Sequence, residues 1–268
     1  MRLTRVLFFT AAFGATMALP AQAELDWDMA LTGDHRAEKN AARDEFRHPR
    51  ETLEFFGLKE GMTVVELAPG GGWYTEVLAP LLKGNGAYYA AHHSPNGSSY
   101  ARRSLGGYLQ KLGENEVYDE VTVTTLAPPA SVVIAPAETA DMVLAFRNIH
   151  SWMRGDTLAE TLIAAYDALK PGGVFGVVQH RASDGRDQDA MKKTAYVSED
   201  FVIAAAKSVV FELADRSEVN ANPKDAGEWE RGVWELPPSL RGDPADREAR
   251  IAVGESDRMT LRFVKPAP

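Results

Sequence analysis

A short apolar segment, a run of glycines and an amphipathic segment occur in immediate succession, and they constrain the fold of this chain more than any other feature. Residues 62–67 (MTVVEL) are apolar and β-branched, which predicts a strand. Residues 73–84 (WYTEVLAPLLKG) have helical periodicity and end at a glycine. Between them, 68–72 (APGGG) supplies glycines that permit positive φ and close approach of the backbone to a ligand. This succession predicts the opening unit of a doubly wound α/β sheet.

The rest of the chain continues to alternate short β segments with helical ones. Parallel strands joined by helices imply a Rossmann-like α/β fold with right-handed crossovers. A ligand then belongs at the carboxyl ends of the central strands. Further strands are expected at 87–92, 120–126, 141–146, 174–180, 211–219 and 259–266, and helices at 98–113, 158–170 and 198–209.

The first 23 residues are interpreted as a separate unit. Arg2 and Arg5 precede an apolar run, and Ala21-Gln22-Ala23 is a small-residue cleavage site, so we predict a secretory signal peptide that is cleaved after Ala23. The apolar run is shorter than the roughly 20 residues that span a bilayer, so we expect no membrane span in the mature form. The predicted location is periplasmic or secreted.

Two further segments are assigned around the sheet. Residues 24–57 are polar and helix-forming, and Pro49 can open a last helix that Gly57 closes, which predicts an N-terminal helical cap. The Rossmann-like domain is then expected to occupy 58–268.

One connection within that domain, 220–258, is long for a compact fold and is interpreted as an inserted loop. We expect its segment 232–240 (GVWELPPSL) to lie over the ligand pocket, opposite the N-terminal helices.

Charge and composition narrow the class of partner. The chain carries 29 Lys and Arg against 38 Asp and Glu, a formal charge of −9, and its basic residues are not clustered in the sequence. No nucleic-acid surface is expected, because tracking a phosphate backbone needs a dense cationic footprint. The absence of cysteine excludes disulfides and thiolate metal sites. The expected partner is a small molecule.

Three segments together carry a resemblance to the class I S-adenosylmethionine-dependent methyltransferases. Residues 64–78 (VVELAPGGGWYTEVL) resemble the first motif of that superfamily, 141–152 (DMVLAFRNIHSW) its fourth-strand motif, and 168–178 (ALKPGGVFGVV) its fifth-strand motif. The chain is also similar to a group of exported predicted bacterial methyltransferases, which share RNIHSW and QHRA. The resemblance implies a seven-stranded sheet with the last strand antiparallel, and S-adenosylmethionine as the cofactor.

The same resemblance implies a set of cofactor-binding residues. Glu66 would lie beside the amino-acid part of the cofactor, and Gly70 and Gly72 hold the second and third glycine positions of the motif. Ala68 replaces the first glycine. The whole expected set is Glu66, Ala68, Gly70, Gly71, Gly72, Trp73, Tyr74, His92, His93, Arg147 and Asn148.

One family feature is missing at the end of the second strand. Most members carry an acid there for the ribose hydroxyls, whereas this chain has His92 and His93. A neutral imidazole can accept a hydroxyl hydrogen bond, although more weakly than a carboxylate. The pair is not expected to bind a metal, because adjacent strand residues point to opposite faces.

A nicotinamide-binding Rossmann unit is the nearest alternative, because it also begins with a strand, a glycine loop and a helix. Its G-x-G-x-x-G pattern would require glycine where the chain has Thr75. The acid Glu66 at the end of the first strand also favours a methyltransferase over a dehydrogenase.

The segment 145–153 (AFRNIHSWM) follows the fourth strand and is rich in polar side chains. His150 is the leading candidate for a catalytic base, because an imidazole can accept a proton near neutral pH. His180, after the fifth strand, is the second candidate, and Arg181 is a candidate partner for a substrate carboxylate or phosphate. Each histidine could instead be a hydrogen-bonded structural residue.

We therefore predict an S-adenosylmethionine-dependent methyltransferase that acts on a small-molecule acceptor. The alternative is a non-catalytic periplasmic module that binds a small molecule on a degenerate methyltransferase fold. Binding of the cofactor without turnover would distinguish the second from the first.

Overall fold

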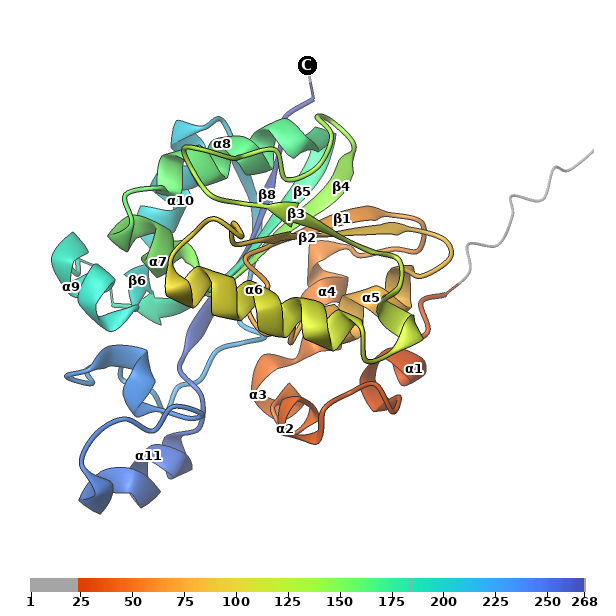
Figure 1. The fold of residues 1–268 in the computed structure, drawn as a ribbon. Coiled ribbons are helices and arrows are strands. Elements are labelled where there is room, and N and C mark those ends of the chain that lie inside the picture. The colour runs from red at the N-terminus through yellow and green to blue at the C-terminus, as the bar shows by residue number, and fades with distance from the viewer. Residues whose placement is uncertain (1–23, 184, 268) are drawn as a thin grey trace, which may run out of the picture.

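The computed structural model describes residues 24–183 and 185–267, so the predicted signal peptide lies outside the described residues. Figure 1 shows a central twisted sheet with helices packed on both faces. The main strand order is β3-β2-β1-β4-β5-β8-β7. The strands are β1 (Thr63–Leu67), β2 (Ala87–His92), β3 (Val121–Thr125), β4 (Ala140–Phe146), β5 (Leu169–Ala182), β6 (Val197–Ser198), β7 (Glu212–Ser217) and β8 (Arg258–Val264).

The helices follow the strands in the expected alternation. They are α1 (Trp27–Thr32), α2 (Glu38–Ala41), α3 (Asp44–Arg47), α4 (Pro49–Phe56), α5 (Thr75–Leu82), α6 (Ser99–Leu112), α7 (Ile149–Arg154), α8 (Leu158–Ala168), α9 (Gln188–Thr194), α10 (Glu199–Ser208) and α11 (Arg247–Val253). Short 3-10 turns occur at η1 (Glu116–Tyr118), η2 (Gly232–Glu235) and η3 (Pro244–Asp246).

The predicted doubly wound sheet is confirmed, including its antiparallel end. β1, β2, β3, β4 and β5 pair in parallel, whereas β8 is antiparallel to both β5 and β7. The two-residue strand β6 was not expected. It forms because β5 continues past the predicted end at His180, so that Arg181 and Ala182 can pair with Val197 and Ser198.

The alternation of side chains along the central strands builds two hydrophobic cores. Val143 and Ala145 of β4 belong to one core, and Met142 and Leu144 belong to the other, because successive strand residues point to opposite faces. Helices α8 and α10 cover the first face, and α4 and α5 cover the second (Figure 1). None of the helices in these described ranges is both long and apolar enough to cross a membrane.

The N-terminal segment forms four short helices, α1 to α4, below the sheet (Figure 1). Pro49 occupies the first turn of α4, where its missing N–H is not needed, and Gly57 ends the helix with φ of 85°. The long connection 220–258 carries η2, η3 and α11, so it contains short helices as well as loop.

The strand register brings the chemistry-bearing segments to one edge of the sheet. Leu67 at the end of β1 pairs with Ala145 of β4, and Ala145 pairs in turn with Val177 of β5. Farther along β5, His180 pairs with Arg258 at the start of β8. The glycine loop, the segment after β4 and the end of β5 therefore meet.

Candidate functional site

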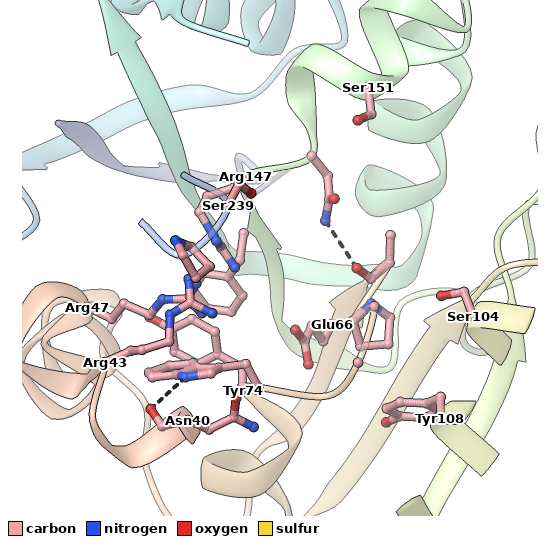
Figure 2. A pocket seen from close by; sticks show the side chains of 18 of the residues that line it. Asn40, Arg43, Arg47, Glu66, Tyr74, Ser104, Tyr108, Arg147, Ser151 and Ser239 are labelled. Atoms are coloured by element: carbon pink, nitrogen blue, oxygen red, sulfur yellow. Dashed lines mark hydrogen bonds between the residues drawn. The ribbon is translucent and has the colours of Figure 1, made fainter. Parts of the chain in front are cut away.

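A cavity of about 1000 Å³ opens at this edge of the sheet. Its walls come from the glycine loop, the helical cap, α6, the segments after β4 and β5, and the connection 220–258. Figure 2 shows side chains from the cap and from the ends of β1 and β4 pointing into the same space.

The glycine loop forms an open cradle on one side of this cavity. A Cβ atom at Gly70 or Gly71 would meet nothing within 4 Å, and both residues line the cavity. Gly72 differs, because a Cβ there would lie 3.0 Å from the ring of Tyr108. The absence of a side chain at Gly72 therefore allows Tyr108 to pack against the loop, and the space for a ligand lies at Gly70 and Gly71.

Ala68 and Asn148 shape the start of the loop. Ala68 has φ of 50°, in the left-handed region that glycine adopts more easily. Asn148 donates from Nδ2 to the carbonyl oxygens of Leu67 at 3.1 Å and Ala68 at 3.2 Å. These bonds tie the loop after β1 to the end of β4, and both Ala68 and Asn148 line the cavity.

Glu66 is a buried carboxyl group that lines the cavity. It accepts a hydrogen bond from the hydroxyl of Tyr88, which also bonds to Thr75 at 2.9 Å. Thr75 bonds in turn to the hydroxyl of Tyr108 at 3.0 Å. Burial raises the pKa of Glu66 to about 7, while Tyr88 and Arg147 act in the opposite direction. This carboxyl can accept bonds from ammonium or hydroxyl groups of a ligand.

His92 and His93 are not among the lining residues of this cavity. Nδ1 of His92 accepts the backbone N–H of His93 at 2.8 Å, so a neutral His92 carries its proton on Nε2. Nε2 lies 3.0 Å from the carbonyl oxygen of Gly70 and donates to it. Burial lowers the pKa of His92, which favours this neutral form. His92 therefore stabilises the glycine loop through a hydrogen bond to the backbone of Gly70.

Helix α6 supplies a wall that sequence reasoning did not identify. Ser104, Gly107 and Tyr108 line the cavity, and a Cβ at Gly107 would meet nothing within 4 Å. The sequence feature that could have indicated this wall is the Gly106-Gly107 pair inside a helix. Each glycine there lowers helix stability by about 1 kcal/mol relative to alanine. Such a pair predicts close approach of another group to the helix.

Trp73 and Tyr74 also line the cavity, and both make aromatic contacts. The Trp73 indole donates to the carbonyl oxygen of Asn40 at 3.0 Å, and the Arg47 guanidinium lies 4.6 Å from a Trp73 ring centroid. Tyr74 stacks on Phe146 with ring centroids 3.5 Å apart and an angle of 8°. The cap residues that reach this wall were also missed from the sequence.

His150 and His180 lie close together at the far side of the cavity, with ring centroids 5.8 Å apart. Nε2 of Gln179 donates to Nδ1 of His150 at 3.3 Å and to the carbonyl oxygen of Ala195 at 2.9 Å. Burial, followed by repulsion from Arg154, lowers the pKa of His150 to about 4. A neutral His150 therefore carries its proton on Nε2 and is a hydrogen-bond donor.

Nδ1 of His180 lies 2.5 Å from the hydroxyl oxygen of Ser256. Burial, with repulsion from His150 and Arg258, holds the pKa of His180 well below its usual range. His180 is therefore neutral near pH 7. Nδ1 of His150 has an amide N–H as its partner, which can only donate. Nδ1 of His180 has a hydroxyl as its partner, which can either donate or accept.

Arg147 reaches the cavity from the end of β4, whereas Arg181 does not line it. Arg181 forms ion pairs with Glu218 at 2.7 Å and Asp257 at 2.8 Å, so its charge is already balanced. The segment 232–240 lies over the cavity as predicted, through Val233, Trp234, Pro237, Pro238 and Ser239. No group of three or more His, Asp or Glu within residues 24–183 and 185–267 is placed to hold a metal.

Comparisons with known proteins identify the fold. No protein-family model matches the sequence, and a search of curated proteins finds no match. A S-adenosylmethionine-dependent methyltransferase from Aquifex aeolicus superposes with a TM-score of 0.55 at 17% identity, covering 84% of this chain and 93% of that chain. The cyclase SpnF superposes with a TM-score of 0.56 at 15% identity, covering 91% of this chain and 87% of that chain.

A third similar structure is a possible exported protein from Bordetella parapertussis, with a TM-score of 0.50 at 14% identity. It covers 84% of this chain and 68% of that chain. The chain therefore shares its fold with S-adenosylmethionine-dependent methyltransferases of known structure, as the resemblance in its three motifs implied for the fold. Because SpnF is a cyclase, the fold leaves the reaction to be argued from the site.

Proposed function

We propose that this protein binds S-adenosylmethionine and transfers its methyl group to a small-molecule acceptor. The observation that carries the proposal is the open cradle at Gly70 and Gly71 beside the buried carboxyl of Glu66. A cradle that a Cβ would fill fits close approach of a ligand to the backbone, and the adjacent acid fits an ammonium or hydroxyl group.

The residues present fit the different parts of this cofactor. Backbone groups of Gly70 and Gly71, with Glu66, would hold the amino-acid part. The wall of α6, with Ser104 and the open space at Gly107, would receive the nucleoside part in place of the missing acid at the end of β2. The remaining space, between His150, His180 and the segment 232–240, would receive the acceptor.

The cofactor supplies a methyl carbon on a sulfonium, and transfer breaks that carbon–sulfur bond as the nucleophile of the acceptor forms a new bond to the carbon. The chain contributes positioning of the two reactants, which can supply much of the rate enhancement. We infer that Oγ of Ser256 accepts a hydrogen bond from Nδ1–H of His180, which leaves the lone pair of Nε2 to receive the proton lost by the acceptor. The lowered pKa of His180 keeps this lone pair unprotonated near pH 7. His150 then donates a hydrogen bond to the acceptor from Nε2.

We also propose that the protein is exported. The predicted signal peptide supports this, as does the likeness to a possible exported protein. N-terminal sequencing of protein recovered from outside the cytoplasm should begin at Glu24. A protein that begins at Met1 and stays with the cytoplasmic fraction contradicts export.

Isothermal titration calorimetry with S-adenosylhomocysteine and S-adenosylmethionine, with NAD as control, tests cofactor binding. We expect micromolar binding of the first two and none of NAD. Gly71→Val should weaken binding at least about tenfold, because its Cβ meets no protein atom within 4 Å and the branched methyl groups occupy the cradle. Gly106→Val is the matched control, since its Cβ also meets nothing and Gly106 does not line the cavity. Equal affinities in the two variants would refute the site.

A further inference from the structure

One part of the cavity carries an excess of positive charge. Arg43 and Arg47 reach it from the cap, Arg147 from the end of β4 and Arg258 from the start of β8. We call these four residues the arginine cluster. Figure 2 shows Arg43, Arg47 and Arg147 gathered on the same side of the cavity.

One carboxylate, Glu255, pairs with three of these arginines. It pairs with Arg43 at 2.5 Å and with Arg47 at 3.2 Å, and it also contacts Arg258. Arg147 is not among its partners. Four guanidinium groups around one carboxylate leave three positive charges unbalanced within this cluster.

The electrostatics of the cluster agree with this count. Burial alone would raise the pKa of Glu255, yet Arg258, Arg47 and Arg147 lower it to about 2. Burial, followed by repulsion from Arg258, lowers the pKa of Arg147 to about 10. Neighbouring Arg36 is not part of the excess, because it pairs with Asp44 and Glu76. Glu66, the other carboxyl group near Arg147, has a pKa of about 7.

The arginine cluster also contains hydrogen-bond donors without an acceptor among the described residues. Arg47 is only 3% exposed, and neither its Nη1 nor its Nη2 has a hydrogen-bond partner among the described residues. Nε of Arg258 is likewise without a partner in that part of the chain. Buried guanidinium donors without partners are costly, and a bound anion would satisfy them.

The proposed cofactor cannot balance this charge. S-adenosylmethionine carries one carboxylate, but it also carries an ammonium and a sulfonium, so its binding adds positive charge to the cavity. Even if its carboxylate lay on one arginine, the cavity would still have an excess of cations. A second, anionic ligand would balance them.

We propose that the arginine cluster is an anion subsite for the methyl acceptor, and that the acceptor is a small molecule bearing a carboxylate or a phosphate. The inference rests on the proposed methyl transfer and names the class of its substrate. Guanidinium groups bind both anions through paired N–H donors. Trp234 and Pro237 line the same cavity and offer apolar surface to the uncharged part of the acceptor. The Nε2 proton of His150 adds a further donor.

A structural role for the cluster is the competing explanation. Arg258 donates from Nη1 to the carbonyl oxygen of Phe46 at 2.9 Å, and Glu255 joins the cap to β8 through Arg43 and Arg258. This role accounts for one carboxylate and for part of each paired arginine. It gives no partner to Arg47 Nη1 and Nη2, and no function to Arg147.

Titration of anions in the presence of saturating S-adenosylhomocysteine tests the subsite. The probes are benzoate and phenyl phosphate, and neutral benzamide is the control of the same shape. We expect both anions, but not benzamide, to bind to the full-length protein with the cofactor product in place. The tighter of the two anions shows whether the acceptor group is a carboxylate or a phosphate.

Variants identify the side chains responsible. Arg43→Gln should weaken binding of the tighter anion about tenfold, because a charge-assisted hydrogen bond is lost. Arg43→Lys should recover part of this loss by restoring the charge. Arg103→Gln is the matched control, since Arg103 also lines the cavity but belongs to α6. Arg43 is the variant of choice because it is the most exposed arginine that pairs with Glu255.

Three results would overturn the inference. Benzamide could bind as tightly as benzoate, Arg103→Gln could weaken the anions as much as Arg43→Gln, or saturating S-adenosylhomocysteine could abolish anion binding. The last result would assign the cluster to the carboxylate of the cofactor itself. Failure of S-adenosylhomocysteine to bind at all is a separate outcome, and it would overturn the proposed function.

Discussion

The side-chain amide of Gln179 donates to Nδ1 of His150 across 3.3 Å. The same amide nitrogen donates to the carbonyl oxygen of Ala195, which fixes the orientation of the amide group. Nδ1 of a neutral His150 is thereby an acceptor already in use, and its proton resides on Nε2. His150, the leading candidate for a base from the sequence, thus presents an N–H at Nε2, and in the proposed mechanism His180 accepts the proton.

This arrangement predicts a dependence of stability on pH. The pKa of His150 falls from 6.5 in the unfolded chain to about 4 in the folded protein. Between pH 6.5 and pH 4, His150 is protonated in the unfolded state but stays neutral in the folded state. The free energy of unfolding therefore decreases as the pH falls toward 4. The contribution of this one group is about 3 kcal/mol at its limit.

Chemical denaturation of wild type and His150→Gln at pH 7.5, 5.5 and 4.5 measures this contribution. The variant is expected to be less stable at pH 7.5, because glutamine does not fill the space of the buried imidazole ring, but to lose less stability on acidification. The difference between the two proteins should therefore shrink as the pH falls. If both proteins lose stability in parallel, His150 titrates normally in the folded state and its lowered pKa is refuted.

A second prediction concerns Glu255 and the charges around it. Removing the carboxylate leaves Arg47 and Arg258, both almost fully buried, without a counter-charge. Glu255→Gln should lower the free energy of unfolding by about 3–5 kcal/mol, as expected for one partner of a buried ion pair. Glu54→Gln is the control, since Glu54 forms an exposed pair with Arg50 and its loss should cost at most about 0.5 kcal/mol.

The same variant links stability to the anion subsite. If the arginine cluster binds anions, phosphate at high concentration should restore more stability to Glu255→Gln than to Glu54→Gln, because an anion can replace the lost carboxylate. Measurements at matched concentrations of sodium chloride separate this specific effect from general screening. Equal recovery in both variants would show that ionic strength alone is responsible.

The order of the elements could be predicted because its signals are local. Apolar β-branched runs and helical periodicity placed the strands and helices, and Pro49 and Gly57 marked both ends of α4. The open cradle at Gly70 and Gly71 follows from the same kind of signal, since the glycines lie between a strand and a helix. Sequence alone did not separate these two from Gly72, because the contact of Gly72 with Tyr108 joins distant parts of the chain.

The arginine cluster could not be predicted, because its members come from distant parts of the chain. Arg43 and Glu255 are 212 residues apart in the sequence yet form an ion pair. Nothing near either residue in the sequence indicates the other. The contribution of α6 to the cavity wall was also not predicted, and the Gly106-Gly107 pair was its one local indication in the sequence. Local patterns thus located the edge of the sheet that holds the site, but not the charge of the cavity there.

The final prediction concerns His92, which lies at the end of β2, where most class I methyltransferases carry an acid. In the structure its Nε2 proton is bonded to the carbonyl oxygen of Gly70, so it acts on the ligand through the position of the glycine loop. His92→Leu should weaken binding of S-adenosylhomocysteine about tenfold, because the half-buried carbonyl of Gly70 loses its donor and the loop can shift. His93→Leu should have little effect, since the bond from residue 93 to His92 uses only its backbone N–H.

His92→Gln separates a lost hydrogen bond from a general defect in packing. The Gln amide can donate to the same carbonyl and should recover part of the affinity, whereas Leu cannot. Calorimetry with S-adenosylhomocysteine on the three variants, together with thermal unfolding of each, provides the comparison. Unchanged affinity in His92→Leu would mean that the loop keeps its conformation without the histidine, and that His92 matters only for folding.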